Sequence, residues 1–166
     1  MRFFYDTYQS PLGIIHIILD EVGVFRVKLT SEGWQKCMDE FGMPIQDKAR
    51  CGEVVHQIEE YFQGQRKQFT VPLSIQGPVF TQRVWQELQN IPYGETRSYA
   101  EVARAIGKPN SCRAVGQANR RNPLPIIIPC HRVIGKNGAM TGYIGKEYIG
   151  MKEKLLEMER TYREKV

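Results

Sequence analysis

A thiol, an imidazole and a guanidinium stand side by side in the segment Pro129-Cys130-His131-Arg132-Val133. A free cysteine has a pKa of about 8.5, and only its thiolate is a strong nucleophile. His131 could take the thiol proton directly or through a water, and nearby positive charge would stabilise the thiolate. The segment therefore suggests a nucleophilic cysteine. For an isolated Cys-His pair the commoner meaning is a structural cysteine beside a hydrogen-bonded histidine.

Three isoleucines, residues 126–128, come immediately before this segment and predict a deeply buried strand or extended stretch. Pro129 must interrupt that stretch, because proline cannot donate to a β ladder. Polar groups at the end of a buried stretch are costly unless they are paired or used in chemistry. The position of the three polar side chains thus predicts that they are paired or used.

The formal net charge is +5, and the positive charge is concentrated in one region. Residues 96–146 contain a single acid, Glu101, while the remainder of the chain is net acidic. The basic residues of this region are Arg97, Arg104, Lys108, Arg113, Arg120, Arg121, Arg132, Lys136 and Lys146. Lysine and arginine gain affinity for polyanions by releasing phosphate counterions, so the asymmetry favours a nucleic-acid partner. A solvated basic surface is the alternative.

The cysteines are scattered and form no Cys-x-x-Cys pair, which favours free thiols in a reducing compartment. No ligand spacing supports the alternative of a zinc site assembled from His16, Cys37, Cys51 and His56. The sequence has no run of about 18 apolar residues and does not open with a signal peptide. We therefore expect a cytoplasmic protein, nuclear in a eukaryote, with no membrane partner, metal or cofactor.

The first part of the chain is typical of an antiparallel meander. Residues 3–8, 14–19 and 24–29 are rich in β-branched and aromatic side chains, and turn residues separate them. A helix is predicted over residues 53–62 and a last strand over residues 69–73. The sequence Gln76-Gly77-Pro78 indicates the boundary between two lobes.

Beyond residue 78 the pattern becomes helical. Phe80, Val84, Trp85 and Leu88 recur at helical spacing. Ser98-Tyr99-Ala100-Glu101 fits a capping box for a second helix, which Gly107 ends. A third helix is predicted from about residue 111 to residue 121. A tight turn joins the last two helices, so they form a helix-turn-helix.

The third helix carries mostly small or basic residues, which fill a core poorly. Small side chains let a helix approach another surface closely, and such a helix can lie in a DNA groove, even the minor one. Ordinary packing of the helix is the alternative. The candidate DNA contacts on this helix and at its end are Arg113, Ala114, Gln117, Arg120 and Arg121, and the basic region adds Arg132.

Six motifs occur in one order along the chain. They are Phe80-Thr81-Gln82-Arg83-Val84-Trp85, Ile91-Pro92-Tyr93-Gly94-Glu95-Thr96, Ser98-Tyr99, Arg113-Ala114-Val115-Gly116, Asn122-Pro123 and Pro129-Cys130-His131-Arg132-Val133. Together they resemble the O6-alkylguanine-DNA alkyltransferases, the methylated-DNA–protein-cysteine methyltransferases. The match is dense between residues 78 and 143 and weaker before them.

The resemblance implies a role for each matching residue. Cys130 would be the alkyl acceptor, and His131 the base that relays its proton through a water. Asn122 would fix the turn that leads to the active-site segment. Arg113 would insert into the base stack where the damaged guanine leaves, and Tyr99 would hydrogen-bond the flipped base. Flipping answers a physical need, because the alkylated oxygen lies inside the duplex.

Two features near the C-terminus depart from the family pattern. Family members usually have Gly-Tyr-x-Gly-Gly, whereas here Lys146 follows Gly142-Tyr143-Ile144-Gly145. Val133, Tyr143 and Ile144 would line the alkyl pocket, so the preferred alkyl size stays open. The family carboxylate that holds the histidine lies in a Leu-Leu-x-x-Glu pattern. The pattern gives Glu159 if the preceding loop carries an insertion, and ungapped counting gives Glu157; we favour Glu159.

The sequence thus predicts an α/β (α+β) protein of two domains. Residues 1–77 would form an antiparallel-sheet lobe with a helix, and residues 78–166 a helical lobe with a winged-helix-like helix-turn-helix. The predicted function is a single-turnover transfer of an alkyl group from O6-alkylguanine in double-stranded DNA to Cys130 by a monomer. The alternatives are a DNA-binding regulator or lesion sensor without chemistry, and a cysteine hydrolase, whose histidine would ordinarily be remote in sequence from the cysteine.

Overall fold

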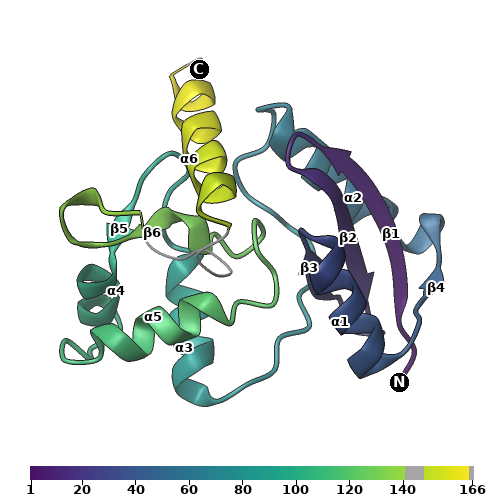
Figure 1. Ribbon diagram of the computed structural model, residues 1–166, viewed down its shortest axis with the longest axis horizontal. Coiled ribbons are helices and arrows are strands. Elements are labelled where there is room, and N and C mark those ends of the chain that lie inside the picture. Colours follow the sequence, from purple (N-terminus) through teal and green to yellow (C-terminus); the bar gives the residue numbers. More distant parts are fainter. Residues whose placement is uncertain (141–147, 165–166) are drawn as a thin grey trace. The chain divides into compact units, whose positions relative to one another are not determined.

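The computed structural model describes residues 1–140 and 148–164. The chain divides into two compact units, Met1–Ile75 and Gln76–Val166 (Figure 1). In the described part of the chain, no helix is long and apolar enough to cross a membrane.

The first unit is built on a four-stranded sheet in the order β3-β2-β1-β4. The first three strands form an antiparallel meander, as predicted, and β4 pairs in parallel with β1. The elements are β1 (Phe4–Ser10), β2 (Gly13–Leu19), β3 (Val24–Lys28), α1 (Ser31–Phe41), β4 (Ile45–Gln46) and α2 (Lys48–Phe62).

The two helices of this unit cover opposite faces of the sheet. The Tyr8 ring stacks on Phe62 of α2 at 6.0 Å, and the Tyr5 ring contacts Trp34 of α1 at 5.0 Å, both between centroids. Successive residues of a strand point to opposite faces, so Tyr5 and Tyr8 of β1 mark the two sides. The sheet is therefore buried on both faces by its own helices.

This unit differs from the predictions in one helix that was missed and one strand that was wrongly expected. Helix α1 was not predicted, and it starts from Thr30, whose side chain accepts a hydrogen bond from Gly33 N. The strand predicted over residues 69–73 is wrong, because only an isolated bridge joins Val24 to Leu73. Pro72 has no N–H to donate, which prevents a continuous ladder there.

The second unit is mainly helical, and α4 and α5 form the predicted helix-turn-helix, which packs on α3 (Figure 1). The indole N–H of Trp85 in α3 donates to Ala118 O of α5 at 2.8 Å. The predicted capping box at Ser98 and Glu101 is present at the start of α4. The elements are α3 (Val79–Leu88), β5 (Arg97–Ser98), α4 (Tyr99–Ala105), α5 (Cys112–Arg120), β6 (Val133–Ile134) and α6 (Ile149–Arg163), with short 3-10 helices at Cys130–Arg132 and Lys136–Gly138.

A short parallel pairing of β5 with β6 brings distant parts of this unit together. Arg97 pairs with Val133 and Ser98 with Ile134. The start of α4 is thereby held beside the residues that directly follow Cys130–Arg132. This pairing explains how Tyr99 comes close to a segment that lies some thirty positions further along the chain.

Residues 126–128 are buried, as predicted, but they form a turn and no strand. Ile128 N donates to Leu124 O at 2.8 Å, and Ile126 has a φ of 78°. A positive φ is rare for a β-branched residue. Pro125 and Pro129 flank the turn, and neither can donate to a ladder. The extended stretch that the isoleucines predicted is therefore replaced by a compact buried turn.

Candidate active site

The turn that leads to Cys130 is held by the side chain of Asn122. Its amide oxygen accepts from Leu124 N at 2.9 Å, and its amide nitrogen donates to Ile128 O at 2.7 Å. The same side chain also lowers the pKa of the Cys130 thiol and so favours the thiolate. Asn122 therefore fixes the turn and favours the charged form of the sulfur.

A second asparagine, Asn119, ties Cys130 to helix α5. Its amide nitrogen donates to Cys130 O at 3.3 Å, and its side chain is 2% exposed. Asn119 lies in the last turn of α5 and Asn122 just after it. The end of α5, the helix predicted to contact DNA, is thus bonded to the backbone of the candidate nucleophile.

His131 is completely buried and pairs with a carboxylate of α6. Its Nε2 lies 2.6 Å from Glu159 Oε2. Glu157 instead lies on the exposed side of α6, where it pairs with Arg160. Of the two carboxylates that the sequence offered, Glu159 is therefore the one that contacts His131. With Nε2 facing Glu159, the second ring nitrogen, Nδ1, is the one suited to receive a proton.

Arg132 was expected to contact DNA, and the structure corrects this. The residue is 6% exposed. Its guanidinium donates from Nε and Nη2 to Glu159 at 2.8 and 3.1 Å, and from Nη1 to Ile91 O at 2.8 Å. A guanidinium that is buried and bonded to the protein in this way does not lie on the surface that a phosphate would reach.

Lys152, which was not predicted as a site residue, is fully buried on α6 and faces the same site. Its ammonium donates to Val133 O, and its charge interacts with Cys130. Burial lowers the pKa of Lys152 to about 8, and Cys130 opposes this. A buried cation beside a thiol stabilises the thiolate over the neutral form.

Burial raises the pKa of the Cys130 thiol to about 11, against the lowering effects of the Asn122 hydrogen bond and the Lys152 charge. The resting sulfur is therefore a thiol at neutral pH, and reaction requires that a base remove its proton. Burial also lowers the pKa of His131, and Glu159 acts in the opposite direction. A neutral imidazole is the form that can accept the thiol proton.

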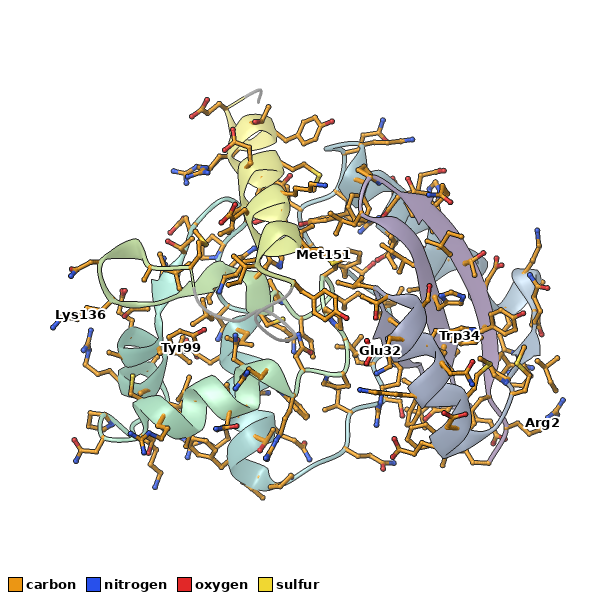
Figure 2. The ribbon with its side chains drawn as sticks, in the orientation of Figure 1. Arg2, Glu32, Trp34, Tyr99, Lys136 and Met151 are labelled. Carbon is orange, nitrogen blue, oxygen red and sulfur yellow. The ribbon has the colours of Figure 1, made fainter. Side chains whose placement is uncertain are left out.

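Most predicted DNA contacts lie on the exposed side of α5 or at its end. Arg113, Ala114, Gln117, Arg120 and Arg121 are exposed. Tyr99 is half-buried at the start of α4 (Figure 2). A Cβ placed on Gly116 would lie 3.9 Å from the Tyr99 ring, which is an ordinary contact distance, so the ring lies close beside α5. These positions agree with a surface that receives a large partner.

Of the predicted pocket residues, Val133 is fully buried, and its carbonyl accepts from Lys152. Tyr143 and Ile144 lie outside the described residues. Within residues 1–140 and 148–164, no group of three His, Cys, Asp or Glu side chains is arranged to hold a metal ion.

Both units match one protein family. Residues 3–75 match the model described as 6-O-methylguanine DNA methyltransferase, ribonuclease-like domain, and residues 79–161 match the DNA binding domain of the same family. The chain belongs to the methylated-DNA–protein-cysteine methyltransferases.

Individual members of this family are similar over nearly the whole chain. The constitutive methylated-DNA–protein-cysteine methyltransferase of Bacillus subtilis is 47% identical over 164 residues, 98% of this chain and 99% of that protein. The crystal structure of the Mycobacterium tuberculosis O6-methylguanine methyltransferase has a TM-score of 0.87 and 39% identity, and covers 96% of this chain and 94% of that one. The M. tuberculosis protein in complex with DNA has a TM-score of 0.85 at 39% identity, with the same coverage. The predicted family and fold class are confirmed.

Sequence reasoning missed Asn119 and Lys152. A signal for Lys152 was available, because Lys152, Leu155 and Glu159 follow one another at helical spacing and share a face of α6. Asn119 gave no comparable signal, since an asparagine near a helix end ordinarily caps it or faces solvent.

Proposed function

We propose that this protein repairs alkylated DNA by moving the alkyl group of an O6-alkylguanine in double-stranded DNA onto its own Cys130, once per chain. The observation that supports this most directly is the bonding of a buried Cys130-His131-Glu159 cluster to the end of an exposed basic helix. A nucleophile and its base are thus attached to an element that suits DNA.

DNA engages the exposed side of α5. Small side chains such as Ala114 permit close approach in a groove, and Arg120 and Arg121 neutralise phosphates. Because Cys130 is 2% exposed, the damaged guanine must leave the stack to reach it. Arg113 fills the vacated place in the stack, and Tyr99 contacts the extruded nucleotide.

The transfer is a single displacement at the alkyl carbon. Glu159 orients His131, and His131 takes the thiol proton of Cys130 directly or through a water. The sulfur–carbon bond forms as the carbon–O6 bond breaks, and the guanine that departs receives one proton, for which Tyr99 is the donor. One proton leaves the thiol and one reaches the guanine, so the reaction consumes none.

The product thioether has no easy leaving group, so each chain reacts once. The residues named above supply the base, the orienting carboxylate and the proton donor, and this route uses no metal or organic cofactor. The protein acts as a monomer in the cytoplasm, where its buried thiol stays reduced.

A duplex with one radiolabelled O6-methylguanine tests the proposal. We expect the label to pass to the protein until one methyl is bound per chain, and the DNA to retain unmodified guanine. Cys130→Ser should bind the duplex and take up no label. Tight binding of the lesion by the parental protein without transfer would instead identify a sensor and refute the proposal.

A further inference from the structure

Glu159 is shared by His131 and Arg132. His131 Nε2 lies 2.6 Å from Oε2, while Arg132 reaches Oε1 from Nε at 2.8 Å and Oε2 from Nη2 at 3.1 Å. Gly94 N adds a fourth contact, to Oε1 at 3.2 Å. The carboxylate is fully buried, and among these contacts Oε1 interacts with Arg132 and Gly94 and Oε2 with His131 and Arg132.

A buried carboxylate beside an imidazole has two opposing effects on the transfer of the thiol proton. It orients the ring, but its negative charge also favours the imidazolium, which cannot accept a thiol proton. An arginine that grips the same carboxylate through two nitrogens offsets this charge. In the observed geometry Glu159 therefore orients the His131 ring, while Arg132 offsets the charge that would favour protonation of that ring.

We propose that Arg132 is a positioning residue for the alkyl transfer, which by sharing Glu159 keeps His131 neutral and able to take the proton of Cys130. The effect of Arg132 on alkyl transfer rests on the proposed function. The protonation state of His131 can be measured without any DNA.

The directions of the pKa shifts support this assignment. Burial lowers the pKa of His131, Glu159 raises it, and the charges of Arg132 and Lys152 lower it further. For Glu159, burial raises the pKa, but the charges and hydrogen bonds of His131 and Arg132 outweigh this and bring it well below the ordinary range. Glu159 is therefore ionised at neutral pH.

Three other titratable groups surround this pair, namely Tyr93, Lys152 and Cys130. Tyr93, in the turn after α3, lies under the Arg132 guanidinium, with 5.5 Å from its ring centroid to Cζ. Burial raises the pKa of Tyr93 to about 12, so it stays neutral. Lys152 of α6 and the Cys130 thiol titrate on the alkaline side. Within this cluster, loss of rate toward acid pH consequently reports His131.

Arg132→Met removes the charge and both contacts to Glu159, and it places an apolar side chain in the buried position. Arg132→Lys keeps the charge but replaces the two-point grip with a single ammonium. Arg160→Met is the matched control, because Arg160 pairs with Glu157 on the exposed side of α6, the helix that also carries Glu159. Two readouts are needed, the pH dependence of single-turnover methyl transfer and the ¹⁵N NMR titration of the His131 ring in DNA-free protein.

In Arg132→Met we expect the acid midpoint of both readouts to rise by about one pH unit, which slows transfer about tenfold below that midpoint. Arg132→Lys should show a smaller shift in the same direction, and Arg160→Met none. Should Arg132→Met fail to fold, the shift in Arg132→Lys decides the matter.

An unchanged His131 titration in the folded Arg132 variants would overturn the inference, as would a loss of rate that is equal at every pH. A shifted titration in a protein that transfers no methyl would refute the proposed function while supporting the role of Arg132. The two failures are therefore distinguishable.

Discussion

Replacing Lys152 with methionine is expected to slow alkyl transfer without a matching loss of stability. Lys152 is fully buried, and its charge interacts with Cys130. Methionine fills a similar volume and removes the charge. The thiolate that forms during the reaction then loses a buried cation that stabilises it.

The size of each effect follows from the surroundings of the ammonium. A cation and a thiolate a few ångströms apart attract each other by about 2 kcal/mol or more at an effective dielectric of about 20, which corresponds to about 30-fold or more in rate. Burial lowers the pKa of Lys152 from 10.5 to about 8, so the ammonium costs the folded state about 3 kcal/mol at neutral pH. Losing the hydrogen bond to Val133 O costs about 1–3 kcal/mol in the other direction. The net change in the free energy of unfolding should stay within about 2 kcal/mol.

The sign of the pH dependence can also be stated. The pKa of Lys152 is depressed in the folded state, so the unfolded chain binds more protons between about pH 8 and pH 10.5. The destabilisation is therefore complete below about pH 8 and fades as pH rises toward 10.5. Lys152→Met should remove this part of the pH dependence.

Single-turnover transfer and urea unfolding of Lys152→Met test these numbers, with the exposed Lys154→Met as the matched control. We expect a slow but stable variant and an unaffected control. A parental rate in Lys152→Met, or a loss of stability large enough to explain the lost activity, would refute the reasoning.

Three further predictions follow from the described contacts. Glu159→Gln should lower the free energy of unfolding by about 3–5 kcal/mol, because it leaves a buried guanidinium without its carboxylate. The control Glu157→Gln should change the free energy of unfolding by less than about 1 kcal/mol. Urea unfolding of both variants tests this. Arg113→Ala should slow transfer from duplex DNA more than it weakens binding, if the side chain holds the duplex open; comparing anisotropy titrations with single-turnover rates tests it, and equal effects would contradict it. Iodoacetamide should label the exposed Cys112 before the buried Cys130 at neutral pH, and labelling of Cys130 should speed up toward pH 11; peptide mapping of a time course measures this, and faster labelling of Cys130 would contradict it.

The parts of the fold with strong local signals were predictable from the sequence. Ser98 and Glu101 satisfy each other's backbone groups, so the start of α4 depends on adjacent residues alone. The strands of the meander and helix α5 were likewise indicated by their own residue types. Helix α1 was missed because Cys37 is its only buried residue, and its stability comes from packing on the sheet.

The errors in the site share a physical cause, which is that partners from distant elements decide the outcome. Arg132 looks like a DNA contact because it lies in a basic segment. Its buried guanidinium instead donates to Glu159 of α6 and to the carbonyl of Ile91. The isoleucines before Pro129 look like a strand, but Asn122 and the flanking prolines close them into a turn. Choosing between Glu157 and Glu159 required the rotational phase of α6, which depends on where the helix begins.

The most direct test of the central claim is mass spectrometry of the protein after one turnover with a duplex that carries O6-methylguanine. We predict a mass increase of one methylene unit, the net change when methyl replaces the thiol proton, mapped by peptide fragmentation to the sulfur of Cys130. Cys112→Ser should gain the same mass and Cys130→Ser none. An unchanged mass, or a methyl found on any other residue, would contradict the account.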